Sequence, residues 1–155
     1  MSPEGKEIIR YTLTNVSGAS VVLSSLGAGI VSVNVPDKDG NIADVVLGYK
    51  TPLSYLNDGP CAGKIPGRYA NRIAHGRFSL DGKEYTLPVN NGPNHLHGGP
   101  EGFQNQIWDS RENEGGVEFM YYSADGEMGY PGDLKVVARY DWSDENELRL
   151  TMTAE

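Results

Sequence analysis

Arginine and histidine side chains gather in two short stretches, GRYANRIAHGRF (residues 67–78) and NNGPNHLHGG (residues 90–99). The first holds three of the chain's 13 lysines and arginines. A guanidinium group is a fixed planar cation with five N–H donors. His97 stands before two glycines, where the backbone can approach a ligand closely. If the two stretches meet in the fold, they form a pocket that could hold a polyhydroxylated neutral ligand through many hydrogen bonds.

The three arginines carry different expectations. We expect Arg72 to point into such a pocket, because it stands between Asn71 and the apolar Ile73. Arg77 is expected to pair with surplus carboxylates at the surface, where ion pairs contribute little. Arg68 fits either description.

The two histidines of the second stretch also raise the possibility of a metal site. His95 and His97 would share a face on a strand, and with Glu101 they form His-x-His-x-x-x-Glu, the beginning of a cupin-type motif for iron, manganese or zinc. No histidine follows His97, and Pro100 with two glycines interrupts the strand. We therefore expect no metal and no cofactor. The structural alternative is that both histidines are hydrogen-bonded residues of a loop or of the core.

Other reactive or aromatic residues carry weaker signals. Cys61 is the only cysteine, so an internal disulfide is excluded, and no His or Asp stands beside it in GPCAGK. We expect a small buried apolar residue rather than a nucleophile. Phe103 and Trp108 either stack on a sugar or pack in the core, and the mid-strand place of Trp108 favours the core.

The elements that must position these residues read as strands. In GIVSVNVP, Val31, Val33 and Val35 alternate with polar residues and are expected on one buried face. Asp81-Gly82 predicts a hairpin turn. No stretch has helical periodicity, and residues 1–155 are expected to form one antiparallel β-sandwich domain. The later strands are predicted at Gln106–Arg111, Val117–Tyr122, Leu134–Trp142 and Leu148–Thr153.

Charge and hydropathy limit the partners. The net charge is −8, from 21 acidic and 13 basic residues. An acidic surface repels phosphate groups, so neither nucleic acid nor an anionic membrane is expected as a partner. No apolar run reaches membrane-spanning length, and the first residues lack the apolar core of a signal peptide. We expect a cytoplasmic protein, although a removed signal would leave no trace.

Three segments resemble the aldose 1-epimerase (galactose mutarotase) family. They are GRYANRIAHGRFSLDGKEYTL, NHLHGGPEGFQNQIW and, less specifically, GAGIVSVNVPDKDGNIADVVLGY. The resemblance implies an enzyme that interconverts the α and β anomers of free hexoses such as glucose and galactose without a cofactor. It implies a large antiparallel β-sandwich, apparently truncated here, with the sugar in an open cleft.

The resemblance also implies roles for individual residues. Asn71 and Arg72 would bind the sugar, and His97 would orient it near the ring oxygen and C1. His95 occupies a position that varies in the family, so no role is carried onto it. The family's usual proton donor is a histidine in a later NHxYFNL-like strand, and its acceptor is a glutamate near the family's C-terminus. Neither segment occurs in this sequence, which resembles only the N-terminal half.

Two functional classes remain open at this point. One is an enzyme whose acid and base come from a missing C-terminal half or a second polypeptide. Self-association is a further way in which the exposed strand edge and apolar sheet face could be covered. The other is a stand-alone carbohydrate-binding β-sandwich module. In both readings a hexose is the expected small-molecule partner, and we expect Arg72 and His97 to face one cleft.

Overall fold

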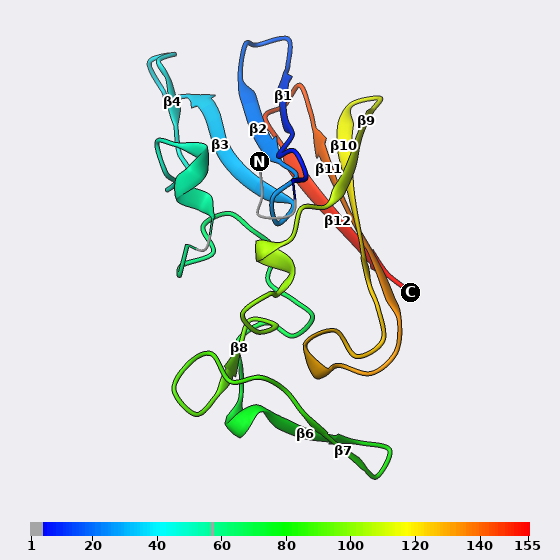
Figure 1. Cartoon of the computed structure of the whole chain (residues 1–155). Coiled ribbons are helices and arrows are strands. Elements are labelled where there is room, and N and C mark those ends of the chain that lie inside the picture. The colour runs from blue at the N-terminus through cyan, green and yellow to red at the C-terminus, as the bar shows by residue number, and fades with distance from the viewer. Residues whose placement is uncertain (1–4, 57) are drawn as a thin grey trace.

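The computed structural model describes residues 5–56 and 58–155, and within them the regular structure consists of β-strands and short 3-10 turns. Two larger sheets lie together at one end of the molecule, and a smaller lobe with short strands lies at the other (Figure 1). No helix of the described residues is long and apolar enough to cross a membrane. The predicted all-β class with antiparallel pairing is confirmed.

The first large sheet comes from the beginning of the chain. Its four strands follow the order β1-β2-β3-β4 with antiparallel pairing throughout. The strands are β1 (Arg10–Thr14), β2 (Ser20–Ser24), β3 (Gly29–Pro36) and β4 (Ile42–Asp44).

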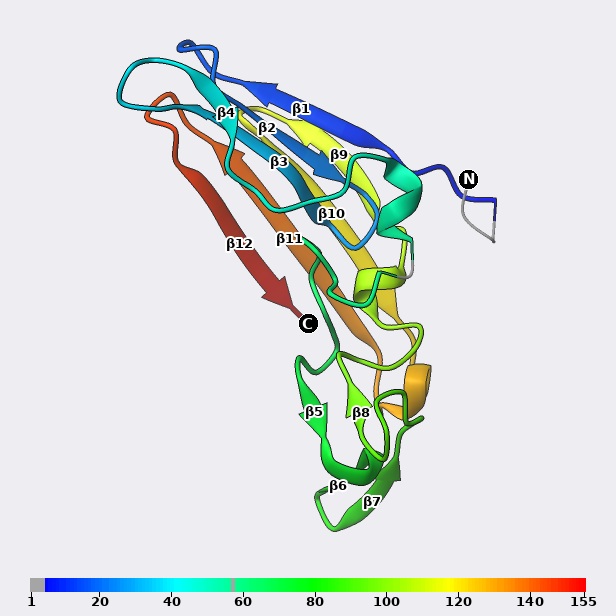
Figure 2. The same ribbon diagram turned by 90° about the vertical axis from the view of Figure 1, so that its left-hand side faces the viewer.

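The second large sheet comes from the end of the chain and is also antiparallel. Its order is β12-β11-β10-β9, so β12 and β9 are its edges. The strands are β9 (Asp109–Asn113), β10 (Gly116–Ser123), β11 (Leu134–Trp142) and β12 (Leu148–Ala154). The two sheets lie face to face, as the side view shows (Figure 2).

The core lies between these two sheets. Alternate residues of β2, β10 and β11 point inward, because successive side chains of a strand face opposite sides of a sheet. The buried set contains aromatic and aliphatic residues in similar numbers, and aromatic rings meet edge to face. Its members are Ala19, Val21, Leu23, Ala28, Phe103, Trp108, Val117, Phe119, Val136, Ala138, Tyr140 and Trp142.

One expectation for β3 is wrong at its first residue. The pairing of β2 with β3 shifts between Val22 and Leu23, so Leu23 pairs with Ile30 while Val22 pairs with Ser32. Val31 is therefore the extra residue of a β-bulge. Ile30, rather than Val31, packs against the core beside Val33. A strictly alternating pattern cannot predict this, because the bulge changes which residues face the core.

The later strands agree with the expected ranges except at one place. Leu134–Trp142 has the predicted bounds, and the neighbouring strands differ by one or two residues. The strand predicted at Gln106–Arg111 begins only at Asp109. Gln106 and Trp108 instead hydrogen-bond to Gly27 and Ser25 at the end of the first sheet, so this segment crosses between the sheets before it joins β10.

The smaller lobe carries the two stretches that hold the candidate residues. Two-residue strands β5 (Arg72–Ile73) and β8 (His95–Leu96) pair with each other. Beside them, β6 (Arg77–Leu80) and β7 (Lys83–Thr86) form the expected hairpin. Single 3-10 turns occur at Pro52–Tyr55, Ala74–Gly76, Phe103–Asn105 and Glu127–Gly129.

The Asp81-Gly82 turn behaves as its sequence predicts. Both residues have positive φ, 52° at Asp81 and 77° at Gly82. Two consecutive left-handed residues are the requirement of a type I′ turn, which matches the twist of the flanking strands. The hairpin holds Phe78 stacked on Tyr85 with ring centroids 5.2 Å apart.

Candidate functional site

Asn71 and His97 form a reciprocal pair that joins the two stretches. The backbone N–H of His97 donates to the carbonyl oxygen of Asn71 at 3.0 Å. The backbone N–H of Asn71 donates to Nδ1 of the His97 ring at 2.9 Å. Both residues have left-handed backbones, with φ of 69° and 53°. Asn71 therefore fixes both the position of the His97 backbone and the orientation of its ring.

Arg72 is held beside this pair by two amide side chains. Its Nε donates to Oδ1 of Asn91 at 2.9 Å, and one terminal nitrogen donates to Oδ1 of Asn71 at 3.2 Å. Arg72 is exposed to solvent and lines one of the two hollows described below, so its place in a ligand pocket stays a prediction. Among the described residues its second terminal nitrogen has no hydrogen-bond partner, which leaves donors free for a ligand.

Asn90 and Asn91 are site residues that the sequence reasoning missed. Asn90 brackets Leu96 with two bonds: its Nδ2 donates to the Leu96 carbonyl at 3.0 Å, and its Oδ1 accepts from the Leu96 N–H at 2.7 Å. Leu96 pairs with Arg72 across β5 and β8. The repeated asparagines before LHGG were the available signal, since such side chains hydrogen-bond the nearby backbone of turns.

Two hollows flank Asn71. His97 lines one of about 390 Å³, together with Asn91, Cys61, Asp58, Gln104 and others, and its walls are mostly polar. Arg72 lines the other, of about 560 Å³, whose remaining walls are Arg68, Tyr69, Ile73, Phe78, Leu80, Tyr130 and Pro131. Asn71 is hydrogen-bonded to a residue of each hollow. The expectation of one shared cleft for Arg72 and His97 therefore stays a prediction, although the two residues are neighbours through Asn71.

Arg68 holds a loop of the protein through its guanidinium group. Its guanidinium donates five hydrogen bonds of 2.8–3.0 Å to the loop that follows β10. The acceptors are the hydroxyl and carbonyl of Ser123 and the carbonyls of Ala124, Pro131 and Gly132. Arg77 lies on the surface, 3.9 Å from Glu84, with both side chains more than half exposed. Of the two arginines that line the larger hollow, Arg68 and Arg72, Arg72 keeps a terminal nitrogen without a protein acceptor in the described part of the chain.

His95 and His97 do not share a strand face. β8 ends at Leu96, and the left-handed backbone of His97 turns its side chain out of the strand. His95 is fully buried, with Nδ1 2.7 Å from the carbonyl oxygen of Pro88 and Nε2 2.8 Å from the hydroxyl of Tyr130. The imidazole spacing read from the sequence therefore does not bring the two rings together.

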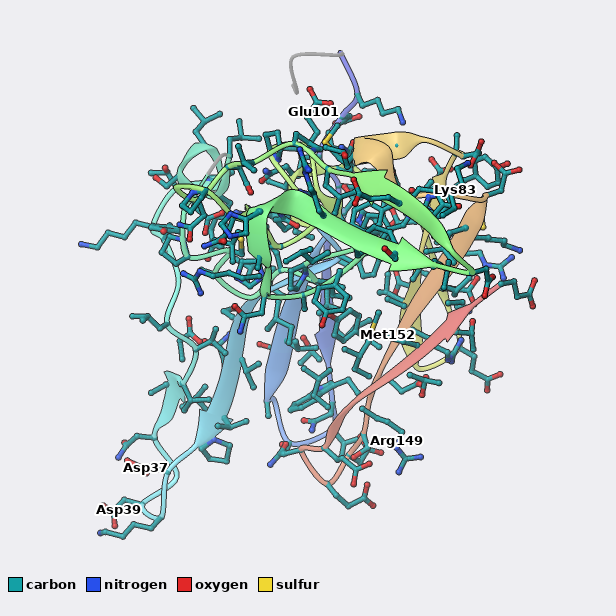
Figure 3. The ribbon with its side chains drawn as sticks, turned by 90° about the horizontal axis from the view of Figure 1, so that it is seen from below. Asp37, Asp39, Lys83, Glu101, Arg149 and Met152 are labelled. Atoms are coloured by element: carbon teal, nitrogen blue, oxygen red, sulfur yellow. The ribbon has the colours of Figure 1, made fainter. Side chains whose placement is uncertain are left out.

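The described residues contain no cluster of three or more His, Cys, Asp or Glu side chains placed to hold a metal ion. Glu101, the third member of the cupin-type pattern, is exposed at the periphery, apart from β12 and its Met152 (Figure 3). Its carbonyl oxygen accepts from Gln106, while its side chain does not line the His97 hollow.

Cys61 lies on the wall of the His97 hollow, where the sequence analysis expected a small buried residue. It is partly buried rather than fully buried. Burial raises the pKa of its thiol, Asp58 raises it further, and Lys64 lowers it. A reactive cysteine needs the opposite shift, because the thiolate is the nucleophile. Phe103 and Trp108 are core residues at 5% and 1% exposure.

A buried ion pair supports the same wall. The Asp58 carboxylate pairs with the Lys64 ammonium, and their side chains are only 2% and 1% exposed. Lys64 also donates to the carbonyl of Tyr55 at 2.7 Å, and Asp58 accepts from the N–H of Ala62 at 2.8 Å. A buried charge needs a partner and satisfied hydrogen bonds. These contacts pair the two charges and fix the loop that carries Cys61.

Known proteins resemble this chain over most of its length. Residues 10–155 match the family model of aldose 1-epimerase. Galactose mutarotase of Bos taurus is 51% identical over 120 residues, which are 77% of this chain and 35% of that protein. Aldose 1-epimerase of Escherichia coli strain K12 is 37% identical over 155 residues, which are 99% of this chain and 45% of that protein.

Solved structures share the fold. A homologue of the aldose epimerases from C. elegans superposes with a TM-score of 0.90 at 34% identity, over 96% of this chain and 46% of that one. Galactose 1-epimerase from Lactobacillus acidophilus NCFM gives 0.86 at 30% identity, over 99% of this chain and 46% of that one. The chain thus spans less than half the length of these relatives and corresponds to their N-terminal part. Because the family model covers residues 10–155 and the fold is shared, this chain belongs to the aldose 1-epimerase family.

Proposed function

We propose that this chain supplies the hexose-binding part of an aldose 1-epimerase site, which interconverts the α and β anomers of free hexoses such as glucose and galactose. Asn71, Arg72 and His97 are the proposed binding residues. The observation that carries the proposal is the hydrogen-bonded arrangement in which Asn71 holds both Arg72 and His97 between two hollows. Its support is the family relationship, in which relatives are named galactose mutarotase and aldose 1-epimerase.

The geometry of His97 supports a donor role. Nδ1 accepts from the Asn71 N–H, so it must carry a lone pair, and the ring proton of the neutral imidazole lies on Nε2. His97 therefore offers an N–H donor to the hollow that it lines. Arg72 offers the N–H groups that Asn71 and Asn91 leave free. Donors fixed before reaction stabilise the charge that develops as a sugar ring opens, without reorganisation at that moment.

Ring opening also requires proton transfer. A base must take the proton of the C1 hydroxyl, and an acid must protonate the ring oxygen. Within the described chain the one carboxylate that lines the His97 hollow is Asp58, and Lys64 engages it. We propose that the acid and the base come from outside these 155 residues, in a longer polypeptide or a second polypeptide. General acid–base groups contribute typically about 10²–10⁴-fold, so the 155 residues alone should be nearly inactive.

The second candidate function is a carbohydrate-binding module without chemistry. The engagement of Asp58 by Lys64 favours it, because that pairing leaves the hollow without a free carboxylate in the described residues. Both candidates require a hexose to bind at Asn71, Arg72 and His97. They differ in whether any natural form of the protein accelerates mutarotation.

Polarimetry separates the two. Fresh α-D-glucose and α-D-galactose would be followed by optical rotation with the 155-residue chain and with the longest natural form that contains it. We expect the longest form to accelerate equilibration, the His97→Ala variant to lose most of that acceleration, and Arg77→Ala to keep it. Hexose binding without acceleration by any form would establish the binding module instead. Absence of both binding and acceleration in the longest form would refute both functions.

A further inference from the structure

His95 is the fully buried histidine that the proposed sugar chemistry does not use. The Pro88 carbonyl oxygen can only accept a hydrogen bond, so Nδ1 of His95, 2.7 Å away, must carry a proton. Nε2 of the neutral ring then has a lone pair, and the Tyr130 hydroxyl at 2.8 Å must be its donor. The geometry thus assigns the Nδ1–H tautomer to His95, whereas His97 requires the Nε2–H tautomer.

Tyr130 is suited to this donor role. The residue is buried, and burial raises the pKa of its hydroxyl to about 12, so the proton is retained at neutral pH. The backbone N–H of Tyr69 lies close enough to the same oxygen to lower that pKa in part. Arg68 lies over the ring, with its guanidinium carbon 5.9 Å from the ring centroid. The hydroxyl therefore faces the backbone of Tyr69 and donates to His95.

Tyr69, Tyr130 and His95 form a continuous set of neighbours, called the brace, and both of its ends lie at the candidate site. One end is Tyr69, two residues before Asn71, and the other is His95, two residues before His97. The strands between them, β5 and β8, are only two residues long, so their ladder alone fixes little. The ring of His95 also packs against Gly99: a Cβ added to this glycine would meet Cε1 of the ring at 2.9 Å.

We propose that His95 and Tyr130 are positioning residues, which hold the Asn71–Arg72 segment and the His97 segment in the register that a sugar requires. His95 lines neither hollow, and Tyr130 lines only the hollow of Arg72. Their positioning effect reaches the ligand through the Asn71–His97 pair and the β5–β8 ladder. The inference rests on the proposed function for its sugar readout, while the brace itself is testable without any sugar.

The first test reads the two tautomers directly. Long-range ¹H–¹⁵N correlation spectra of the 155-residue chain at pH 7.5 distinguish a protonated from an unprotonated ring nitrogen. We expect the Nδ1–H pattern for His95 and the Nε2–H pattern for His97, with His75 as a solvent-exposed reference. The Nε2–H pattern at His95 would overturn the brace, because Pro88 would then face a lone pair.

The second test removes the donor alone. Tyr130→Phe keeps the ring and deletes the hydroxyl, and Tyr85→Phe is the matched control in the same lobe. We expect amide hydrogen exchange at Asn71 and His97 to quicken at least tenfold in Tyr130→Phe, with exchange in β10 and β11 unchanged. Galactose affinity should fall at least threefold. Exchange rates at Asn71 and His97 equal to those of Tyr85→Phe would contradict the proposal.

Two replacements of His95 separate positioning from bulk packing. The amide of a glutamine reaches the place of Nε2, and that of an asparagine reaches the place of Nδ1. His95→Gln can still accept from Tyr130 and should keep exchange and affinity within about twofold of the parent. His95→Asn loses that contact and should resemble Tyr130→Phe. Equal behaviour of the two variants would reduce His95 to a packing residue.

The outcomes also distinguish this inference from the proposed function. If the chain bound no hexose while the tautomers and the exchange pattern held, the function would fail and the brace would stand. If hexose bound equally to the parent chain and to Tyr130→Phe, the binding function would stand and the positioning role would be refuted.

Discussion

At the scale of single residues, Asn71 connects the two other residues of the candidate site. Its backbone N–H, backbone carbonyl and side-chain oxygen each serve a different contact: the His97 ring, the His97 N–H and the Arg72 guanidinium. The left-handed φ of 69° makes this possible, and Asn is among the few non-glycine residues that adopt it readily. Asn71 thus orients both of the other proposed sugar-binding residues, Arg72 and His97.

Geometry rather than charge should decide the contribution of Arg72. Arg72→Lys keeps the positive charge but loses the planar fork that contacts Asn71 and Asn91 while presenting free N–H groups. We expect galactose to bind about tenfold more weakly, which corresponds to about 1.4 kcal/mol. Isothermal titration calorimetry provides the measurement, and Arg77→Lys on the exposed hairpin is the control. Unchanged affinity in the Arg72→Lys variant would mean that charge alone suffices.

The sequence predicted which residues lie together, while their roles stay predictions. The motifs identified Asn71, Arg72 and His97 as a group, and the structure places them in contact. The sequence could not separate Arg68 from Arg72, because the five acceptors of Arg68 come from residues more than 50 positions later. Long-range partners of this kind leave no local pattern.

At the scale of elements, the short strands β5 and β8 depend on their surroundings. The side chain of Asn90 bonds the backbone N–H and carbonyl of Leu96 on the unpaired side of β8. The contact of His95 with Tyr130 fixes the turn that follows β8. The long strands of the two large sheets are different, because each buries alternate side chains in a common core. Period-two patterns therefore predicted the long strands well. The bulge at Val31 and the crossing segment before Asp109 depend on pairing between strands, which a single stretch does not encode.

The edge strand β12 should make the chain associate. Within residues 5–56 and 58–155 it pairs with β11 alone, and Leu150 and Met152 on its core-side face are 43% and 48% exposed. An unpaired edge and an open apolar face both favour further pairing. We expect light scattering to show a mass above that of the monomer, rising with protein concentration.

Charge on that face should abolish the association. Leu150→Lys with Met152→Lys places ammonium groups where an apolar partner surface would pack, and we expect the monomer mass at all concentrations tested. Thr151→Lys with Thr153→Lys adds the same charge on the opposite face of the strand and should leave association in place. Figure 3 shows β12 with Arg149 and Met152. A parent chain that stays monomeric at every concentration would contradict the prediction.

At the scale of the whole molecule, the two large sheets form a scaffold and the smaller lobe carries the candidate site (Figures 1 and 2). Tyr140 ties the scaffold together, because its hydroxyl crosses the core and donates to the carbonyl of Ala28 at 2.8 Å. Burial raises the pKa of that hydroxyl to about 12. The native state therefore keeps this proton at pH values where the unfolded chain, with a tyrosine pKa near 10, has lost it.

Stability should consequently fall as the pH rises from about 10 to about 12. In that range the native state binds more protons than the unfolded state, so the free energy of unfolding decreases with pH. The contribution of Tyr140 is of the order of 2–3 kcal/mol. Urea unfolding of the parent and of Tyr140→Phe at pH 8 to 12 tests this. We expect parallel plateaus below pH 9.5 and a shallower decline in the variant, whereas equal declines would contradict the assignment.

The central claim is that Asn71, Arg72 and His97 together bind a hexose. A ¹H–¹⁵N NMR titration of the 155-residue chain with D-galactose tests it most directly, because each proposed contact has its own signal. We predict saturable shifts at the backbone of Asn71 and His97, at Nε of Arg72 and at the side chain of Asn91. Signals around Glu118 and Lys135, in a separate hollow on the outer sheet face, should stay unchanged. Saturable shifts confined to other surfaces, or none at any galactose concentration, would contradict the account.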